Sequence, residues 1–564
     1  MRAKTPVALW LPLVAPALVL GAADNKEIQK VIDGELAAGQ RTILIPKSVY
    51  SLDPGAVASI HLKNVKDVTI DFQGSELQGK VRSGMIRLDN CDGVTFKNVV
   101  IDYPHRLPFT QGVIRNVGPD GEWDVEIAEG YEDQSSIRPQ GDDGKTGYAN
   151  EPSVWPIQVY DGKTGELVNP MRMGGEKVTR VGDGRYSIIG GKNKRGNVGD
   201  VVVWSRPCDT YSTTQSISNR AHAVYLVNCR NCRMEDITVY STPGGNGFRE
   251  LLGDGGNTYL RCSVVPRAPE SDPVKRALPR YRSGNHDAFN SRGMKIGPKI
   301  IGCVARNHCD DDVNIHGPYQ YVASAHGRVA RAFVKDMYVG TLKVGDPVQV
   351  VTKEGYSPLA QPVVTAIRPA KPTEAEVSDV RERLLPNIAA GCNTMIEVVF
   401  DRDCDALQAG ALFVSQNQNG NGFVIQDCKF GPNRARGFIC NASFGTVSNC
   451  IFDRLESAGV LSRPSYKYLE GGASRNVRFK DCTFIDCGVF FGVHKEMETT
   501  PDCHRNIAFA GCKFKGPKAK MDVRCCRGFS VDDSTFDLLE PNAMRLTHVE
   551  DALVRRVGYG EYQK

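Results

Sequence analysis

Short segments in which apolar and polar residues alternate recur along most of this chain. Seven of them carry β-branched or aromatic residues at alternate positions: residues 68–72, 94–101, 234–239, 423–430, 447–452, 477–484 and 507–514. A period of two with this composition predicts strands. Gly, Asn and Asp separate the segments, which predicts tight turns between the strands. Helical periodicity is almost absent, so the sequence indicates an all-β protein.

The strand segments repeat at a spacing that the cysteines mark. Cys428, Cys450, Cys482 and Cys512 follow one another at intervals of 22, 32 and 30 residues. Short strands at such intervals are typical of a solenoid, and we interpret the chain as a right-handed parallel β-helix. A β-sandwich is the alternative, but sandwich sequences give antiparallel hairpin signals and lack a recurring x-Cys-x-Phe element.

Seven cysteines occupy similar places in the repeat, each directly after Asn, Asp or Gly: Cys91, Cys229, Cys303, Cys428, Cys450, Cys482 and Cys512. This shared position predicts a stack of small buried side chains inside the β-helix, for which Cys is well suited. Cys229 and Cys232 have the spacing of zinc ligands. No second pair of ligands follows at a suitable distance, so we expect no metal there.

Two stretches, residues 106–210 and residues 319–415, interrupt the repeat. Each contains a Gly-Asp turn that runs into a Val-rich strand, as in small β-barrels. We predict two inserted β-barrel-like domains that wall the groove beside the active site, because long insertions in solenoids gather on one face. Residues 372–383 of the second insertion predict a helix capped by Thr373. The rungs of the β-helix would then be residues 24–105, 211–318 and 416–564.

The net charge and the N-terminal residues bear on the partners and on the cellular location of the protein. The formal net charge is only +5, and no run of Lys or Arg exceeds two residues, so nucleic acid is not an expected partner. Residues 1–23 combine a basic start, an apolar stretch and small residues at 21–23, which predicts a cleaved signal peptide. No later segment is long and apolar enough to span a bilayer. We therefore expect a secreted or periplasmic protein.

The densest group of polar residues lies between the two insertions. Asp287 precedes the pair Asp310 and Asp311 by 23 and 24 residues, about one turn of a β-helix. Neighbouring rungs lie ~4.8 Å apart, so the carboxyl groups are expected at ~5–9 Å, which suits glycoside hydrolysis. Crowded carboxylates raise one another's pKa, so one can stay protonated as a general acid. Asn314 and His316 are expected to share one face and to bind sugar hydroxyls.

Two features of this group bear on its interpretation. Strict strand alternation would place Asp310 and Asp311 on opposite faces, so pairing them requires a bend or bulge. A run of three aspartates is also found in solvated corners and calcium sites, and we interpret Asp312 as structural. His286 and His308 flank the acids, and their presence beside a rung-spaced Asp287 favours function.

The segment from Asp310 to Gly317, Asp-Asp-Asp-Val-Asn-Ile-His-Gly, resembles the Asp-Asp-x-x-Asn-x-His-Gly signature of the bacterial α-1,3-galactosidases of glycoside hydrolase family 110. The segment Asn285-His-Asp-Ala-Phe289 resembles the family's other acidic motif. The likeness extends over most of the mature chain. Cys309 and Asp312 flank the acid pair where smaller residues such as Gly are expected.

The resemblance implies a substrate, a mechanism and a set of roles. The substrate would be an oligosaccharide or glycoconjugate that ends in α-1,3-linked galactose, as in the blood group B antigen, cleaved by an exo-acting enzyme with inversion and without a cofactor or metal. Asp310 would be the general acid, and Asp287 and Asp311 would hold and deprotonate the attacking water. His286, Glu250 and Arg436 are further candidates for contact with the substrate, and Glu456 lies on the rung after Arg436.

Two other functions remain open. A polygalacturonase-like pectin hydrolase would share the fold, but it must grip a carboxylated chain with Arg or Lys near the acids, and no Arg-x-Lys closely follows His316-Gly317. A non-catalytic carbohydrate-binding β-solenoid would have no reason to align acids across rungs. It would instead present exposed aromatic residues, and the chain has only four Trp.

Overall fold

The computed structural model describes residues 25–55, 57–133, 157–169, 177–189, 196–205, 221–352, 355–357, 361–466, 468–493 and 503–560. The expected signal peptide, residues 1–23, lies outside the described residues. Within them, no helix has both the length and the apolar character needed to cross a membrane.

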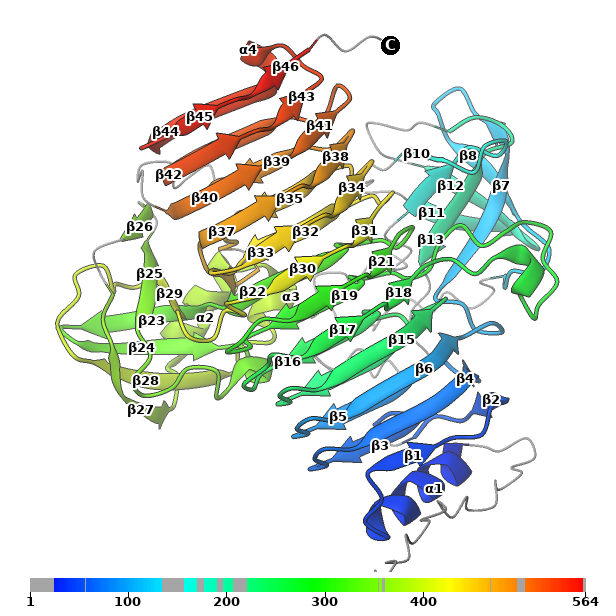
Figure 1. Ribbon diagram of the computed structural model, residues 1–564, viewed down its shortest axis with the longest axis horizontal. Helices are drawn as coiled ribbons and strands as arrows, with labels where there is room; N and C mark the ends of the chain where they lie inside the picture. Colours follow the sequence, from blue (N-terminus) through cyan, green and yellow to red (C-terminus); the bar gives the residue numbers. More distant parts are fainter. Residues whose placement is uncertain are drawn as a thin grey trace, which may run out of the picture.

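Three ladders of parallel strands wind into one coil, which rises from the N-terminal rungs to the C-terminal rungs (Figure 1). The first ladder contains β3 (Ile60–Lys63), β5 (Ile86–Asp89), β14 (Val224–Val227), β16 (Phe248–Leu251), β19 (Phe289–Arg292), β22 (Val313–Pro318), β32 (Arg436–Asn441), β35 (Ala458–Ser462), β39 (Val489–Phe491), the first half of β42 (Met521–Asp532) and β44 (Met544–Glu550).

The second ladder contains β1 (Thr42–Leu44), the first parts of β4 (Thr69–Gly79), β6 (Thr95–Asp102) and β15 (Arg233–Val239), then β17 (Thr258–Leu260), β20 (Lys299–Ile301), β30 (Val424–Gln426), β33 (Thr446–Ser448), β37 (Arg475–Lys480), β40 (His504–Ala510), the second half of β42, and β45 (Leu553–Arg555). The third contains β2 (Val49–Leu52), the last parts of β4, β6 and β15, then β18 (Ser263–Val264), β21 (Val304–Ala305), β31 (Lys429–Phe430), β34 (Ile451–Asp453), β38 (Thr483–Ile485), β41 (Lys513–Lys515), β43 (Thr535–Phe536) and β46 (Gly558–Tyr559). The prediction of an all-β parallel β-helix is confirmed.

The residue before each repeated Cys turns the chain at a corner of the coil. Asn90, Asn228, Asp427, Asn449 and Asp481 have φ angles of 54°, 52°, 56°, 52° and 53°, the left-handed region that Asn, Asp and Gly tolerate best. The Cys that follows points inward and is at most 1% exposed in every case. The buried stack is therefore present, and it is divided between two corners, because some of these turns join the first ladder to the second and others join the second to the third.

Aromatic rings stack inside the coil two residues beyond the later cysteines of this series, and two residues beyond Ser534 on the rung where Ser takes the place of Cys. Phe452, Phe484, Phe514 and Phe536 lie on successive rungs, with ring centroids 5.0, 4.7 and 4.4 Å apart. Offset stacking at this distance adds to the free energy gained by burying each ring. The x-Cys-x-Phe element is thus the sequence signature of a corner that buries one small side chain and one large one.

The two insertions have the same strand order. The first is an antiparallel sheet of seven strands in the order β10-β9-β13-β7-β8-β12-β11. The second has the order β26-β25-β29-β23-β24-β28-β27, which repeats the first strand for strand. The first consists of β7 (Phe109–Val117), β8 (Trp123–Ile127), β9 (Ile157–Tyr160), β10 (Leu167–Asn169), β11 (Lys177–Gly182), β12 (Arg185–Ile189) and β13 (Val201–Ser205). The second consists of β23 (Gln320–His326), β24 (Val329–Val334), β25 (Val348–Thr352), β26 (Gly355–Ser357), β27 (Val364–Ala370), β28 (Thr394–Phe400) and β29 (Leu412–Ser415).

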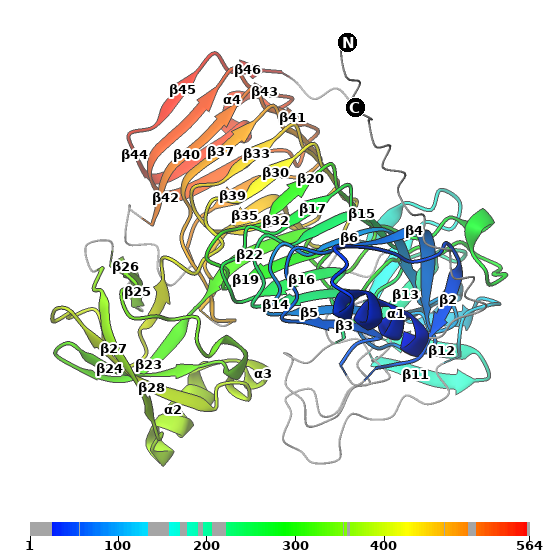
Figure 2. The ribbon, with the colours of Figure 1, turned by 60° about the horizontal axis from the view of Figure 1, so that its bottom comes forward.

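The inserted sheets lie on opposite sides of the coil in both ribbon views (Figures 1 and 2). The rungs before and after each insertion pair directly with each other. Across the first, Ile86 of β5 pairs with Val224 of β14. Across the second, Val313 of β22 pairs with Phe438 of β32. Each inserted sheet therefore leaves the hydrogen bonding of the coil unbroken.

Four α-helices are present in the described residues. Helix α2 (Glu374–Arg383) begins after Thr373, whose side chain and that of Glu376 form a capping box, as the sequence predicted. Helices α3 (Pro386–Ala389) and α4 (Glu540–Ala543) are single turns. The sequence prediction missed α1 (Asn25–Ala37), which buries Ile28 and Ile32 against the first rungs. It covers the N-terminal end of the coil, where the stacked strands would otherwise expose apolar side chains.

Candidate active site

Asp287 and Asp311 occupy equivalent places on adjacent rungs, each two residues before a strand of the first ladder, β19 and β22. The backbone N–H of Asp311 donates a 3.3 Å hydrogen bond to Oδ1 of Asp287. One carboxylate oxygen from each of Asp287, Asp310 and Asp311 lies within 4.8 Å of those of the other two. The structure thus brings together the three acids that the one-turn spacing predicted, at the short end of the expected range.

Asp287 is buried and has few polar contacts. Asn290 Nδ2 donates a hydrogen bond to its Oδ2, and Arg292 Nη2 lies 3.9 Å from the same oxygen. Burial, followed by the charge of Asp310, raises the pKa of Asp287 to about 6, although Arg292 lowers it. A carboxyl group in this environment changes its protonation close to neutral pH, as acid-base catalysis requires.

Asp311 is equally buried but has a cationic partner. Arg436 Nε lies 2.7 Å from Oδ1 of Asp311, and Arg436 Nη2 donates to Oδ2 at 3.0 Å. Asn314 Nδ2 is 3.5 Å from Oδ2. Burial raises the pKa of Asp311 well above its ordinary value, Arg436 opposes this effect, and the charges of Asp310 and Asp287 add to it. Arg436 and Asn314, predicted to contact substrate, thus both contact Asp311.

Asp310 is the most accessible of the three acids, with 27% of its side chain exposed. His286 Nδ1 lies 3.9 Å from its Oδ2, and Arg434 Nη2 lies 4.0 Å from its Oδ1. The side chain of Asn433 donates a hydrogen bond to its backbone carbonyl. Asp310 therefore presents a carboxyl group toward the outside of the cluster, above two buried acids.

Two other acids point into the coil. Asp312 forms a fully buried pair with His308, whose Nε2 lies 2.6 Å from Oδ1. Glu250 is also fully buried, and it accepts hydrogen bonds from Ser291 Oγ at 2.6 Å and Asn257 Nδ2 at 2.9 Å. The expectation that Glu250 contacts substrate does not fit this position, because residues 248 and 250 share the inward face of β16, whereas residues 249 and 251 point outward.

Several charged residues beside Asp287 were not identified from the sequence. Arg292 Nη2 lies 3.7 Å from Glu470 Oε1, and His316 Nε2 lies 3.6 Å from the same oxygen. Lys335 Nζ donates to a backbone carbonyl at 2.6 Å, and burial lowers its pKa to about 8. Glu470 belongs to β36 (Glu470–Gly471), which pairs with the end of β22. Asp287 and Asp311 therefore have Arg neighbours, Arg292 on the rung of Asp287 and Arg436 on the rung after Asp311, and Lys335 is a neighbour of Glu470.

His316 is neutral in this group. Its Nδ1 lies 3.0 Å from the carbonyl of Gly317, so Nδ1 carries the hydrogen and Nε2 is an acceptor. Burial lowers the pKa of His316 to about 4, although Glu470 raises it. His316 is thus positioned to accept a hydrogen bond but not to donate a proton near neutral pH.

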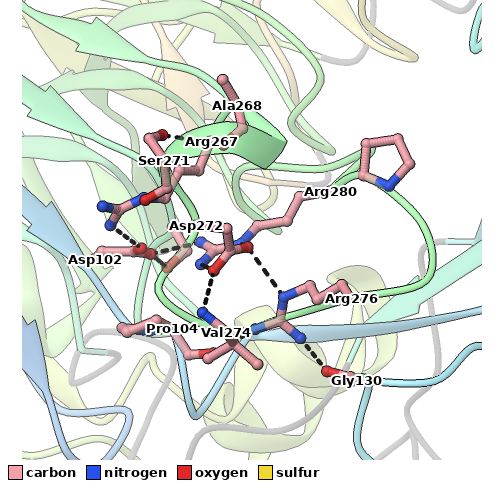
Figure 3. Close-up of polar contacts among 12 residues, drawn as sticks. Asp102, Pro104, Gly130, Arg267, Ala268, Ser271, Asp272, Val274, Arg276 and Arg280 are labelled. Atoms are coloured by element: carbon pink, nitrogen blue, oxygen red, sulfur yellow. Dashed lines mark hydrogen bonds and ion pairs between the residues drawn. The ribbon is translucent and has the colours of Figure 1, made fainter.

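A network of buried ion pairs holds the long segment between β18 and β19, which leads to Asp287 (Figure 3). Asp102, at the end of β6, accepts hydrogen bonds from Arg267 at 2.9 Å and Arg280 at 2.7 Å. Asp272 accepts from Arg280 at 2.6 Å and from Arg276 at 3.0 Å. Because each buried charge has opposite charges in direct contact, the network fixes the path of the segment.

Arg282 connects the first inserted sheet to the same segment. Its buried guanidinium donates to Gln158 Oε1 at 2.7 Å, to the carbonyl of Val203 at 3.0 Å and to Asn285 Oδ1 at 3.2 Å. Gln158 also accepts a hydrogen bond from the Cys309 thiol at 3.0 Å. The first insertion therefore contacts both loops that carry the acids, directly before Asp287 and directly before Asp310.

The acids could also bind a cation, since three carboxylate oxygens lie within 4.8 Å of one another. Arg436 and Arg292 already place positive charge beside Asp311 and Asp287. Among the described residues, the cluster is thus partly compensated by protein side chains, as in sites where carboxyl groups act on a substrate directly.

No family model matches the chain. Two curated bacterial proteins are similar to it over most of its length. It is 22% identical to α-1,3-galactosidase B of Bacteroides thetaiotaomicron over 496 residues, which is 81% of this chain and 72% of that protein. It is 25% identical to α-1,3-galactosidase B of Phocaeicola vulgatus over 522 residues, which is 84% of this chain and 77% of that protein.

Solved structures of other enzymes are similar at lower identity. The A-module of a mannuronan C-5 epimerase from Azotobacter vinelandii aligns with 96% of this chain and 97% of its own, at 9% identity and a TM-score of 0.40. The exopolygalacturonase of Thermotoga maritima aligns with 94% of this chain and 88% of its own, at 11% identity and a TM-score of 0.37.

Proposed function

We propose that the protein is an exo-acting glycoside hydrolase that removes terminal α-1,3-linked galactose, as found in blood group B-type glycans, with inversion at the anomeric carbon. The observation that carries the proposal is the convergence of Asp287, Asp310 and Asp311 from adjacent rungs, with oxygens within 4.8 Å of one another. The likeness to two α-1,3-galactosidases over more than four-fifths of the chain supports the choice of substrate.

Asp310 is the proposed general acid, because it is the exposed member of the cluster. Its proton passes to the glycosidic oxygen as the bond from that oxygen to the anomeric carbon breaks. A water held by Asp287 and Asp311 attacks the anomeric carbon from the other side and gives up a proton to one of them. The anomeric carbon loses its bond to the glycosidic oxygen and gains a bond to the water oxygen. The proton that the water gives to Asp287 or Asp311 balances the proton that Asp310 donates, and exchange with solvent returns all three acids to their starting state.

The short separation between Asp287 and Asp311 fits a shared water. A water that donates to two carboxylate oxygens at ~2.8 Å, at a near-tetrahedral angle, spans about 4.6 Å between the acceptors, and the two oxygens lie within 4.8 Å. Carboxyl groups about 5 Å apart are otherwise typical of retaining enzymes, in which one of them is the nucleophile. The configuration of the galactose that is released first therefore distinguishes an inverting mechanism from a retaining one.

Substrates with different leaving groups test the roles. Asp310→Asn should lower kcat for an α-1,3-galactosyl disaccharide by about 100- to 10,000-fold. It should affect 2,4-dinitrophenyl α-galactoside far less, since that leaving group departs without a proton. Asp287→Asn and Asp311→Asn should be impaired on both substrates. Proton NMR of the wild-type reaction should show β-galactose first.

Other outcomes would contradict the proposal in distinct ways. Release of α-galactose first would replace inversion by retention. Equal losses of activity on both substrates in all three variants would remove the role of Asp310 as acid. Release of galacturonic acid from a pectic oligosaccharide, with no action on galactosides, would move the protein to the pectin-directed enzymes. Binding without turnover of any of these sugars would leave a carbohydrate-binding solenoid.

A further inference from the structure

Arg249 lies on the outward face of the first ladder, one rung from the acids. It pairs in register with Asn290, the residue that donates to Asp287, and Asn290 pairs with Asn314. Arg249 is only 3% exposed, and its guanidinium carbon lies 5.4 Å from the centre of the Tyr225 ring. A guanidinium buried to this extent normally contacts a carboxylate.

Arg249 has no acceptor for most of its hydrogens. Its Nε and Nη2 are buried and have no hydrogen-bond partner among the described residues. Its Nη1 lies 3.0 Å from His222 Nε2, but His222 Nδ1 accepts a 2.9 Å hydrogen bond from the backbone N–H of Asn246. Because Nδ1 of His222 accepts this hydrogen bond, the neutral ring carries its hydrogen on Nε2. Arg249 Nη1 and His222 Nε2 are then both donors, and neither can accept from the other. The site therefore needs acceptors that the protein does not supply.

Acceptors without partners lie next to these donors. Among the described residues, Oδ1 of Asn290, Oδ1 of Asn314 and Nε2 of His316 are buried without a hydrogen-bond partner, as is the donor Nε of Arg292. Asn290 Nδ2 donates to Asp287 and Asn314 Nδ2 donates to Asp311. These hydrogen bonds fix the orientation of both amides and direct each Oδ1 away from the acids. Three unpaired donor nitrogens and three unpaired acceptors thus lie on three neighbouring strands. At ~4.8 Å per strand, they cover about the area of one pyranose ring.

We propose that Arg249, Asn290, Arg292, Asn314 and His316 form the subsite for the terminal sugar, in which Arg249 donates hydrogen bonds to sugar hydroxyls. Each sugar hydroxyl both donates and accepts, so a ring of hydroxyls satisfies donors and acceptors together. This inference rests on the proposed function.

Arg87 offers a matched control for Arg249. It is on the same outward line of the first ladder, and its guanidinium carbon lies 5.1 Å from the centre of the same Tyr225 ring. It differs in having its own carboxylate, since Arg87 Nε donates to Asp89 Oδ1 at 2.8 Å. Substitution of Arg87 removes the same packing on Tyr225 without removing an unpaired donor.

Binding and kinetics of the full-length variants test the proposal. Calorimetry with galactose is compared with KM and kcat on 4-nitrophenyl α-galactoside. Arg249→Gln should weaken galactose binding and raise KM by about 10- to 100-fold, since it removes hydrogen bonds from a charged donor. Arg87→Gln should change both by less than about twofold. Arg249→Lys keeps the cation and most of the packing, and it should fall between wild type and Arg249→Gln.

Three results would overturn the inference. One is galactose binding unchanged in both Arg249 variants, each with a wild-type melting temperature. A second is an equal loss of galactose binding in Arg87→Gln and Arg249→Gln. A third is a wild-type protein that neither binds nor cleaves galactosides, and only this one would also refute the proposed function. If Arg249→Gln fails to fold, galactose binding by Arg249→Lys, at a wild-type melting temperature, is the deciding measurement.

Discussion

Burial controls the protonation of Asp287 more than any neighbouring charge does. Its pKa in the folded protein is about 6, against 3.8 for an unperturbed Asp. The folded state therefore binds this proton more tightly than the unfolded state between these two values. It follows that Asp287 favours folding most below pH 4, and that this contribution is lost as the pH rises through 6.

Replacing Asp287 should therefore stabilise the protein at neutral pH. Asp287→Asn should raise the free energy of unfolding by roughly 1–3 kcal/mol at pH 7.5, because it removes a buried charge. At pH 4 the difference should nearly vanish. Urea unfolding at the two pH values measures this effect. Equal effects of Asp287→Asn at both pH values would contradict the account.

The sequence predicted the acids but only some of the residues that surround them. Asp287, Asp310 and Asp311 could be found because their spacing matches one rung, a local property of the chain. Arg436 could be proposed only as a candidate, since it reaches Asp311 across the whole second insertion. Glu470 and Arg249 were missed, or left as weak candidates, because contact with the acids depends on strand register and on which face each side chain occupies. Glu250 was named as a candidate substrate contact for the same reason, since the sequence did not show that it points inward.

At the scale of the element, the corner residues explain the repeat better than the cysteines do. The sequence indicated single strands at 423–430 and 447–452, whereas each is two short strands on different ladders, separated by a left-handed residue. Alternation of apolar residues continues through the corner, so periodicity alone did not reveal it. The Asn or Asp before each Cys was the signal, since these residues adopt positive φ most readily after Gly.

Asn449 provides a test of this explanation. It has a φ angle of 52°, and its Nδ2 donates to Asp427 Oδ1 of the neighbouring corner at 2.6 Å. Asn449→Ala should lower the free energy of unfolding by about 1–2 kcal/mol, because Ala tolerates positive φ poorly and lacks the amide. Asn449→Gly should cost less, since Gly adopts this conformation freely. Chemical unfolding of both variants measures the order, and an Ala variant at least as stable as the Gly variant would refute it.

At the scale of the whole molecule, the core of the coil contains many unpaired thiols. Seventeen cysteines of the described part are buried. Burial raises the pKa of Cys440 to about 12, which suppresses the reactive thiolate. The packing of the core keeps this many thiols apart from oxidants. The repeated position of the cysteines in the sequence correctly indicated this buried stack.

Thiol labelling should therefore report directly on the integrity of the coil. Native protein treated with iodoacetamide at pH 8 should leave the seventeen buried cysteines unmodified for hours, as peptide mass spectrometry would show. The same treatment in concentrated guanidinium should modify all of them. Rapid modification of Cys440 or of its neighbours in native protein would contradict the packing described for the core.

The closure of the rungs over both insertions has a consequence for engineering and for evolution. Since Ile86 pairs with Val224 and Val313 pairs with Phe438, the ends of each inserted sheet leave and rejoin the coil at neighbouring points. Such junctions accept foreign domains, shortened loops or exchanged modules with little effect on the host fold. The shared strand order of the two sheets is what duplication of one ancestral module, followed by its transfer to a second junction, would produce.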